Sequence, residues 1–211
     1  MALRHLLENL TERNPLDTEW RDALPILHDG TVTLRELRAG DAASLVDQLS
    51  RPGVWRFIEP CPSTAEGFRR FIRWTHAERR HGTLACYGII LGRPARAVGL
   101  IQVWRVERDF STAEWGVALG EPFWGTGAFM RAAHLVLDVV FSQLRVYRLE
   151  ARAVDANVRG NRALEKLGAK REGVLRGGFH DGVVIRDHVM WSILAPEWRS
   201  NRMRGARANQ V

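Results

Sequence analysis

The sequence predicts an α/β (α+β) domain in which helices flank a sheet. Three successive patterns indicate this fold class. A strand-like segment, a glycine-bearing loop and an amphipathic helix follow one another over 113–144. A second strand, a capped turn and a shorter helix fill 148–168. Two further strand-like segments within 170–194 flank Asp181-Gly182, a favoured two-residue hairpin turn.

The N-terminal part contains strand and helix signals in alternation. Alternating side chains at 31–37 predict a first strand, and Asp41 begins a helix that ends near Leu49. Residues 51–62 read as a loop with a short helical piece. The chain divides into an N-terminal appendage at 1–30 with a helix at 2–12, a main domain at 31–198, and a basic C-terminal tail at 199–211.

A second helix and two apolar strands follow. Ser63 and Glu66 have the spacing of a capping box that opens a helix, and Gly82 is placed to end it. The apolar segments 84–91 and 97–106 then predict two neighbouring strands.

The loop that holds Gly125 and Gly127 is a candidate phosphate site. Glycine lets backbone amides approach an anion, and the start of a helix adds N–H groups without acceptors and a partial positive charge. A turn before a helix can also carry glycines for its own geometry. The helix after the loop is amphipathic, with apolar residues at helical spacing: Phe129, Ala133, Val136, Val140 and Leu144.

The block Arg148–Ala169 contains a strand, a turn capped at Asn157 and a short helix ended by Gly168. With the preceding loop, this block resembles the GNAT superfamily of acyl-CoA-dependent N-acyltransferases. Two segments are most similar to the Rim-type branch, which acetylates alanine or serine N-termini of ribosomal proteins: Trp124-Gly125-Thr126-Gly127 and Asn157 through Gly168. The resemblance covers roughly 31–198, which makes this the N-acetyltransferase domain. It implies a mixed, mostly antiparallel seven-stranded sheet that splays in the middle, where acyl-CoA enters.

The resemblance implies acetyl-CoA as the cosubstrate and no metal. The strand backbone would pair with the pantetheine arm, and the glycine loop would wrap the pyrophosphate. Phe129 stands where the family usually has Gly or Ala, so we expect a shifted cradle. Asn157 has an alternative role as a helix N-cap. The implied cofactor contacts are Val117, Ala118, Leu119, Trp124, Gly125, Thr126, Gly127, Ala128, Phe129, Asn157 and Asn161.

Two departures from the family bear on the leaving thiolate. Leu164 stands where many members have a tyrosine that acts as general acid, and Gly160 stands where the ribosomal-protein branch often has serine. We therefore expect the leaving thiolate to be stabilised by backbone amides, by Asn157 or Asn161, or by water.

Glu114 is the candidate general base. Strand alternation places it on one face with Gly116 and Ala118, opposite Trp115, Val117 and Leu119. The alternative is a surface glutamate paired with one of the many arginines.

The acceptor site is expected at Trp55, Phe57, Glu59 and His180, although Trp55 and Phe57 suit a core equally well. The pKa of an α-amine is near 8, about 1 unit above pH 7, whereas the pKa of a lysine amine is more than about 3 units above pH 7. Keeping an α-amine neutral at pH 7 therefore costs less free energy. A modest base such as Glu114 is better matched to an α-amine.

Composition limits the partners. The net charge is +7, which fits a phosphate-bearing ligand, while the basic residues form no stripe with interleaved aromatics; nucleic acid is expected only through a ribosomal substrate. Two lone cysteines, no secretion signal and no membrane-length apolar run indicate a cytoplasmic protein. A homodimer stays open.

The sequence thus predicts an acetyl-CoA-dependent N-acetyltransferase that acts by direct attack of an acceptor amine on the thioester. The expected acceptor is the N-terminal α-amine of a protein or peptide. The alternatives are a small-molecule amine, such as an antibiotic or metabolite, and a degenerate CoA-binding regulatory module.

Overall fold

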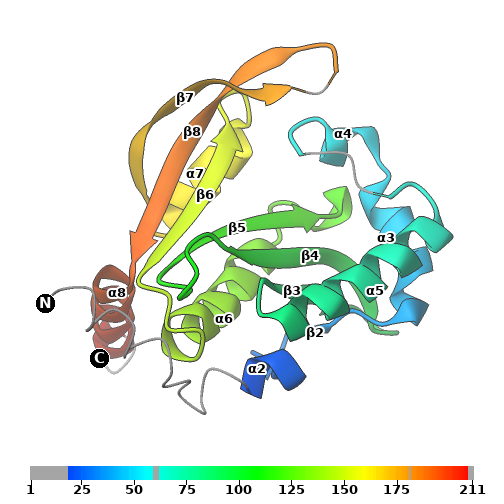
Figure 1. Cartoon of the computed structure of the whole chain (residues 1–211), viewed down its shortest axis with the longest axis horizontal. Helices are drawn as coiled ribbons and strands as arrows, with labels where there is room; N and C mark the ends of the chain where they lie inside the picture. The colour runs from blue at the N-terminus through cyan, green and yellow to red at the C-terminus, as the bar shows by residue number, and fades with distance from the viewer. Residues whose placement is uncertain (1–18, 59–61, 181, 209–211) are drawn as a thin grey trace, which may run out of the picture.

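The computed structural model describes residues 19–58, 62–180 and 182–208. One mixed sheet runs through the molecule in the order β1-β2-β3-β4-β5-β6-β8-β7 (Figure 1). All neighbouring strands are antiparallel except β5 and β6, which are parallel. The predicted fold class is confirmed. The strands are β1 (Leu27–His28), β2 (Thr33–Glu36), β3 (Leu84–Leu91), β4 (Arg96–Arg105), β5 (Thr112–Leu119), β6 (Arg148–Val154), β7 (Lys170–His180) and β8 (Ile185–Leu194).

The sheet has eight strands, one more than the resemblance implies. The additional strand is β1, which pairs Leu27 with Leu34 and His28 with Thr33 of β2. Two residues are too few to show an alternating pattern, so the sequence does not predict this strand. It is defined by its pairing with β2.

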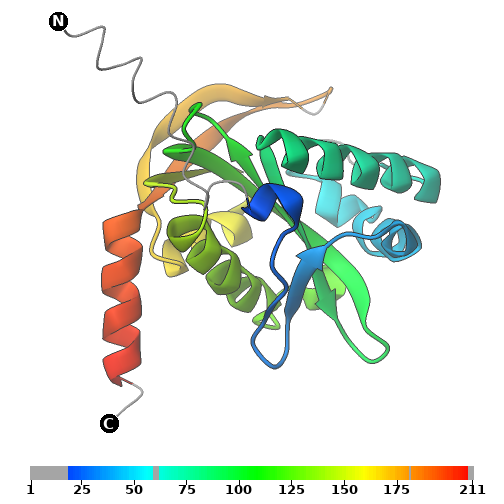
Figure 2. The same ribbon diagram turned by 60° about the horizontal axis from the view of Figure 1, so that its bottom comes forward.

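Helices cover both faces of the sheet. Helices α3 and α5 pack on one face, and α6 packs on the other (Figure 2). The helices are α2 (Glu19–Asp22), α3 (Ala42–Leu49), α4 (Pro52–Trp55), α5 (Ala65–His81), α6 (Ala128–Ser142), α7 (Val158–Lys166) and α8 (Ala195–Ala208), with 3₁₀ turns η2 (Ala39–Asp41) and η3 (Glu121–Phe123).

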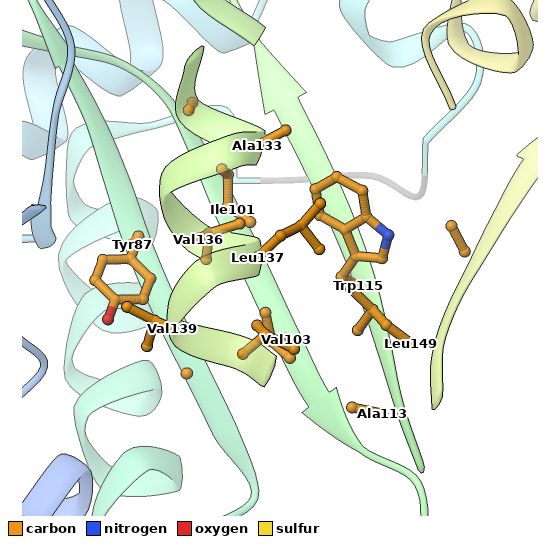
Figure 3. Close-up of a cluster of buried hydrophobic side chains, with 14 of the residues drawn as sticks. Tyr87, Ile101, Val103, Ala113, Trp115, Ala133, Val136, Leu137, Val139 and Leu149 are labelled. Atoms are coloured by element: carbon orange, nitrogen blue, oxygen red, sulfur yellow. The ribbon is translucent and has the colours of Figure 1, made fainter. Parts of the chain in front are cut away.

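Strand β3 has apolar side chains on both faces, so helices are needed on both faces of the sheet to bury them. Its alternate residues enter two different cores: Tyr87 and Ile89 face the α6 side, and Cys86 and Ile90 face the α3/α5 side. A strand buried on both faces is apolar throughout, as this one is. Figure 3 shows the α6 side, where Val136 and Leu137 pack among strand residues that include Tyr87 and Trp115.

Helix α5 begins one residue later than the predicted capping box. Thr64, not Ser63, is the N-cap, and its hydroxyl accepts a hydrogen bond from the Gly67 N–H at 3.0 Å. Glu66 pairs instead with Arg69 and Arg73 on the exposed face, at 3.2 and 3.5 Å. The predicted end is confirmed, because Gly82 adopts a left-handed conformation with φ 71°.

The segments at either end of the predicted domain have regular structure where the chain is described. Trp20 and Leu24 are buried in the α6-side core, so residues 19–30 contribute to the fold. Residues 199–208, expected as a tail, continue helix α8. The predicted helix at 2–12 lies outside the described residues, as does Asp181 of the predicted hairpin turn. Cys61, one of the two cysteines of the chain, also lies outside them.

Candidate active site

The sheet opens between its two parallel strands. The pairing of β5 with β6 covers Thr112 to Glu114 and ends there, opposite Glu150. Beyond this point the strands diverge (Figure 1), so in the described part of the chain no strand lies beside 117–119 on the edge of β5 that faces β6. The splay expected from the resemblance is present.

A cleft of about 520 Å³ occupies this opening. Its walls come from β5, the glycine loop, β6, α7 and the short helix α4 with the loop after it. Most residues expected to contact acetyl-CoA lie in the walls, whereas Thr126, Ala128 and Asn161 do not. The expected residues that line the cleft are Val117, Ala118, Leu119, Trp124, Gly125, Gly127, Phe129 and Asn157.

The glycine loop is shaped by two left-handed residues. Gly125 and Gly127 have φ of 74° and 86°, a region that other residues rarely adopt, and nothing lies within 4 Å of a Cβ built on either. The first intrahelical hydrogen bond of this turn runs from the Arg131 N–H to the Gly127 carbonyl at 3.1 Å. The amides of the preceding turn are therefore at the open end of the helix, where anions bind.

Two aromatic residues hold this loop against the sheet. The indole N–H of Trp124 donates to the Leu119 carbonyl at 2.8 Å, so one carbonyl expected to serve the pantetheine arm is already engaged. Phe129 stacks on Trp115, with ring centroids 6.2 Å apart and planes at 24°. The large side chain of Phe129, at a position where the family usually has Gly or Ala, is thus accommodated by packing on the core.

Asn157 adopts the alternative role that the sequence left open. Its side-chain oxygen caps α7 by accepting from the Gly160 N–H at 2.9 Å, and the residue also lines the cleft. A Cβ on Gly160 would lie 2.6 Å from Asn157 Nδ2. A serine there would displace the Asn157 side chain from its present position, which accounts for the glycine.

Asn161, an expected cosubstrate contact, has a structural role in the fold. Its amide nitrogen donates to the carbonyls of Val154 and Asn157, both at 2.9 Å, and its oxygen accepts from the Trp191 indole at 2.8 Å. Both amide hydrogens are used in joining α7 to β6 and β8.

Glu114 lies where β5 and β6 part, in an ion pair. Its Oε2 is 3.2 Å from Nη2 of Arg152, and the two side chains are 27% and 44% exposed. Arg152 lines the cleft and Glu114 does not. The ion pair with an arginine, which the sequence offered as the alternative to a general base, is therefore present.

The residues expected to form the acceptor site lie in different parts of the structure. Phe57 lines the cleft, whereas Trp55 packs on the α3/α5-side core and exposed His180 is not in the lining. Glu59 lies outside the described residues. The cleft also has lining residues that sequence reasoning missed: Gly53, Val54, Ile58, Arg152, Arg159, Arg162 and Lys166. Arg159, Arg162 and Lys166 could have been predicted from the sequence, because their spacing of three and seven residues places them on one face of a helix.

Cys86 is a core residue. It is buried in β3, and burial raises the pKa of its thiol, which opposes a nucleophilic role. Among the described residues, no three His, Cys, Asp or Glu side chains gather as a metal site, and no helix is long and apolar enough to cross a membrane.

The comparison with known families matches this architecture. A sequence model of the acetyltransferase (GNAT) domain matches residues 31–170. The chain belongs to the GNAT acetyltransferase family. The "Probable N-acetyltransferase YjcK" of Bacillus subtilis (strain 168) is 30% identical over 135 residues, covering 64% of this chain and 75% of that protein. The "Putative ribosomal N-acetyltransferase YdaF" of the same strain is 25% identical over 177 residues, covering 81% and 95%.

Solved structures share the fold of this N-acetyltransferase. A "putative acetyltransferase" from T. thermophilus superposes with a TM-score of 0.71 at 32% identity, covering 88% of this chain and 98% of that one. The ribosomal-protein-S5-alanine acetyltransferase of Vibrio fischeri gives 0.75 at 17% identity, covering 82% and 98%. Mycobacterium smegmatis RimJ in complex with CoA-disulfide gives 0.73 at 23% identity, covering 82% and 87%.

Proposed function

We propose that this enzyme transfers the acetyl group of acetyl-CoA to the N-terminal α-amine of a protein or peptide, with ribosomal proteins as the first candidates. The observation that carries the proposal is the cleft itself: the glycine loop stands at one part of its wall, and β5 and β6 part beside Glu114. The names of YdaF and of the Vibrio fischeri S5-alanine enzyme point to ribosomal acceptors for those two proteins.

The residues present fit acetyl-CoA. The amides around Gly125 and Gly127 offer donors for the pyrophosphate at the start of α6. The Val117–Ala118 backbone is an open strand edge for the amides of the pantetheine arm. When bound, acetyl-CoA supplies an activated thioester carbonyl. The chain's task is then to hold that carbonyl and to deliver a neutral amine to it.

Glu114 is our candidate for removing the amine proton. It lies in register with Trp104 and Glu150, at the point where the strands separate. The ion pair with Arg152 is partly exposed on both sides, and such pairs contribute only about 0–1 kcal/mol. An acceptor amine or a water can therefore compete for the carboxylate. Attack of the neutral amine on the carbonyl carbon then expels the thiolate, with no covalent enzyme intermediate.

The wall of the cleft is apolar on the α4 side. Gly53, Val54, Phe57 and Ile58 line it and carry no charge. This surface fits a small or apolar first side chain beside the reacting α-amine, which is compatible with an alanine or serine N-terminus.

The test is an acceptor panel with detection of free thiol. Peptides beginning with Ala, Ser, Met or Glu, the same peptides with a blocked α-amine and an internal lysine, and small amines are each incubated with acetyl-CoA. We expect turnover with Ala and Ser peptides and none with blocked ones. Turnover restricted to small amines or to blocked lysine peptides would overturn the assignment of the acceptor.

A further inference from the structure

Three basic side chains of α7 lie along one wall of the cleft. They are Arg159, Arg162 and Lys166, and all three are exposed. Their spacing of three and seven residues places them on one face of the helix. At about 1.5 Å per residue the row extends roughly 10 Å along the cleft.

The three side chains of this row lack an ion-pair partner among the described residues. The described lining of the cleft contains no acidic side chain. Neighbouring positive charges along one wall raise the free energy of the protein unless an anion is bound between them. The wall therefore suits a ligand with several negative charges.

The start of the row is anchored beside the glycine loop. The guanidinium of Arg159 lies 3.6 Å from the centre of the Trp124 ring, across the cleft from α7. Trp124 opens the loop whose amides suit a pyrophosphate. Arg162 and Lys166 lie further along the helix, beyond the reach of this aromatic contact, and so remain available for a second anionic group.

Coenzyme A carries such a group, because its ribose bears a 3′-phosphate in addition to the pyrophosphate. We propose that Arg162 and Lys166 bind this 3′-phosphate and make the enzyme selective for coenzyme A esters over their 3′-dephospho forms. An arginine fork can bond two phosphate oxygens at once, and a lysine adds a compact charge. The inference rests on the proposed use of acetyl-CoA.

The experiment compares two ligands on two proteins. Dissociation constants for acetyl-CoA and 3′-dephospho-acetyl-CoA are measured by calorimetry with wild-type enzyme and with the double variant Arg162→Gln/Lys166→Gln. We expect wild type to prefer acetyl-CoA by about 10- to 100-fold, the usual effect of charge-assisted hydrogen bonds. The double variant should bind both ligands within about threefold of each other, and dephospho-acetyl-CoA as wild type does.

A matched double variant controls for net charge and folding. Arg171→Gln/Arg176→Gln also removes two positive charges, from exposed arginines of β7 that do not line the cleft, and should keep the full preference. Thermal unfolding of all variants verifies the fold. Equal binding of the two ligands by wild type, or a preserved preference in the double variant, would overturn the inference while leaving the proposed function standing. A wild-type protein that binds neither ligand would overturn the proposed function.

Discussion

Gly127 shows how a single residue determines the geometry of the anion site. Its φ of 86° is left-handed, and the surrounding space is open. A side chain at this position therefore meets no clash, and its cost is conformational. That cost is about 1–2 kcal/mol, and the loop can avoid it by rotating its amides out of place.

Gly127→Val should lower acetyl-CoA affinity at least about tenfold in a protein that still folds, because about 1.4 kcal/mol corresponds to a factor of ten. Isothermal calorimetry and thermal unfolding measure the two quantities. Gly173→Val is the control, since that glycine also has open space but lies in strand β7 without a left-handed φ. Unchanged affinity in folded Gly127→Val would show that the loop does not bind the cosubstrate.

Glu114→Gln should reduce turnover about 10²- to 10⁴-fold, the usual effect of losing a general base. Acetyl-CoA affinity should barely change, because the glycine loop and the open edge of β5 are intact. The loss should shrink as the pH approaches the α-amine pKa near 8, where the solution already supplies neutral amine. A variant that turns over at the wild-type rate from pH 6 to 9 would leave Glu114 with a structural role only.

At the scale of elements, an ionic network ties the three strands beyond the cleft together. Arg148 of β6 contacts Glu150 at 2.8 Å and Glu172 of β7 at 2.5 Å, and the Ser192 hydroxyl of β8 donates to Glu172 at 2.7 Å. These contacts hold β6, β8 and β7 as one unit on the far side of the splay.

The network predicts a pH-dependent contribution to stability. The hydrogen bonds from Arg148 and Ser192 lower the pKa of Glu172 to about 2, from an ordinary value of 4.5. Because the folded pKa is depressed, the contribution is complete above pH 4.5 and is lost as the pH falls toward 2. Glu172 is 39% exposed, so solvent screening limits the effect to about 1 kcal/mol.

Urea unfolding of wild type and Glu172→Gln therefore should show a stability difference at pH 6 that narrows as the pH falls below about 4.5. Glu165→Gln, which changes an exposed glutamate outside the network, should show no such trend. A difference for Glu172→Gln that is constant with pH would contradict the assigned pKa.

At the scale of the whole molecule, the segment before the family match belongs to the main core. Trp20 is 6% exposed and packs edge-on against Phe110, with ring centroids 5.5 Å apart. Phe110 precedes β5, so the segment is fastened to the half of the sheet that forms one wall of the cleft.

Trp20→Ala should destabilise the protein by about 3–5 kcal/mol, the usual cost of removing a buried tryptophan. Chemical denaturation measures the change, with exposed Glu19→Ala in the same helix as the control. A loss below about 1 kcal/mol would show that residues 19–30 do not stabilise the core.

Local patterns sufficed for much of the fold. The strands at 84–91 and 113–119, the helix ending at Gly82 and the cap at Asn157 depend on residues close in sequence, which is why alternation, helical spacing and capping chemistry predicted them. The two-residue strand β1 and the shift of the α5 cap to Thr64 depend on a neighbouring strand and on competing local hydroxyls.

The sequence by itself determined the family, the order of the elements and the residues of the glycine loop, because these are written in short contiguous motifs. Only the tertiary structure decided which side chains share the cleft. It paired Arg152 of the cleft wall with Glu114, joined Asn161 to the Trp191 indole by a hydrogen bond, and brought Arg159 over Trp124. Each of these contacts joins residues on different elements, and the divergence of β5 from β6 is what brings those elements around one opening.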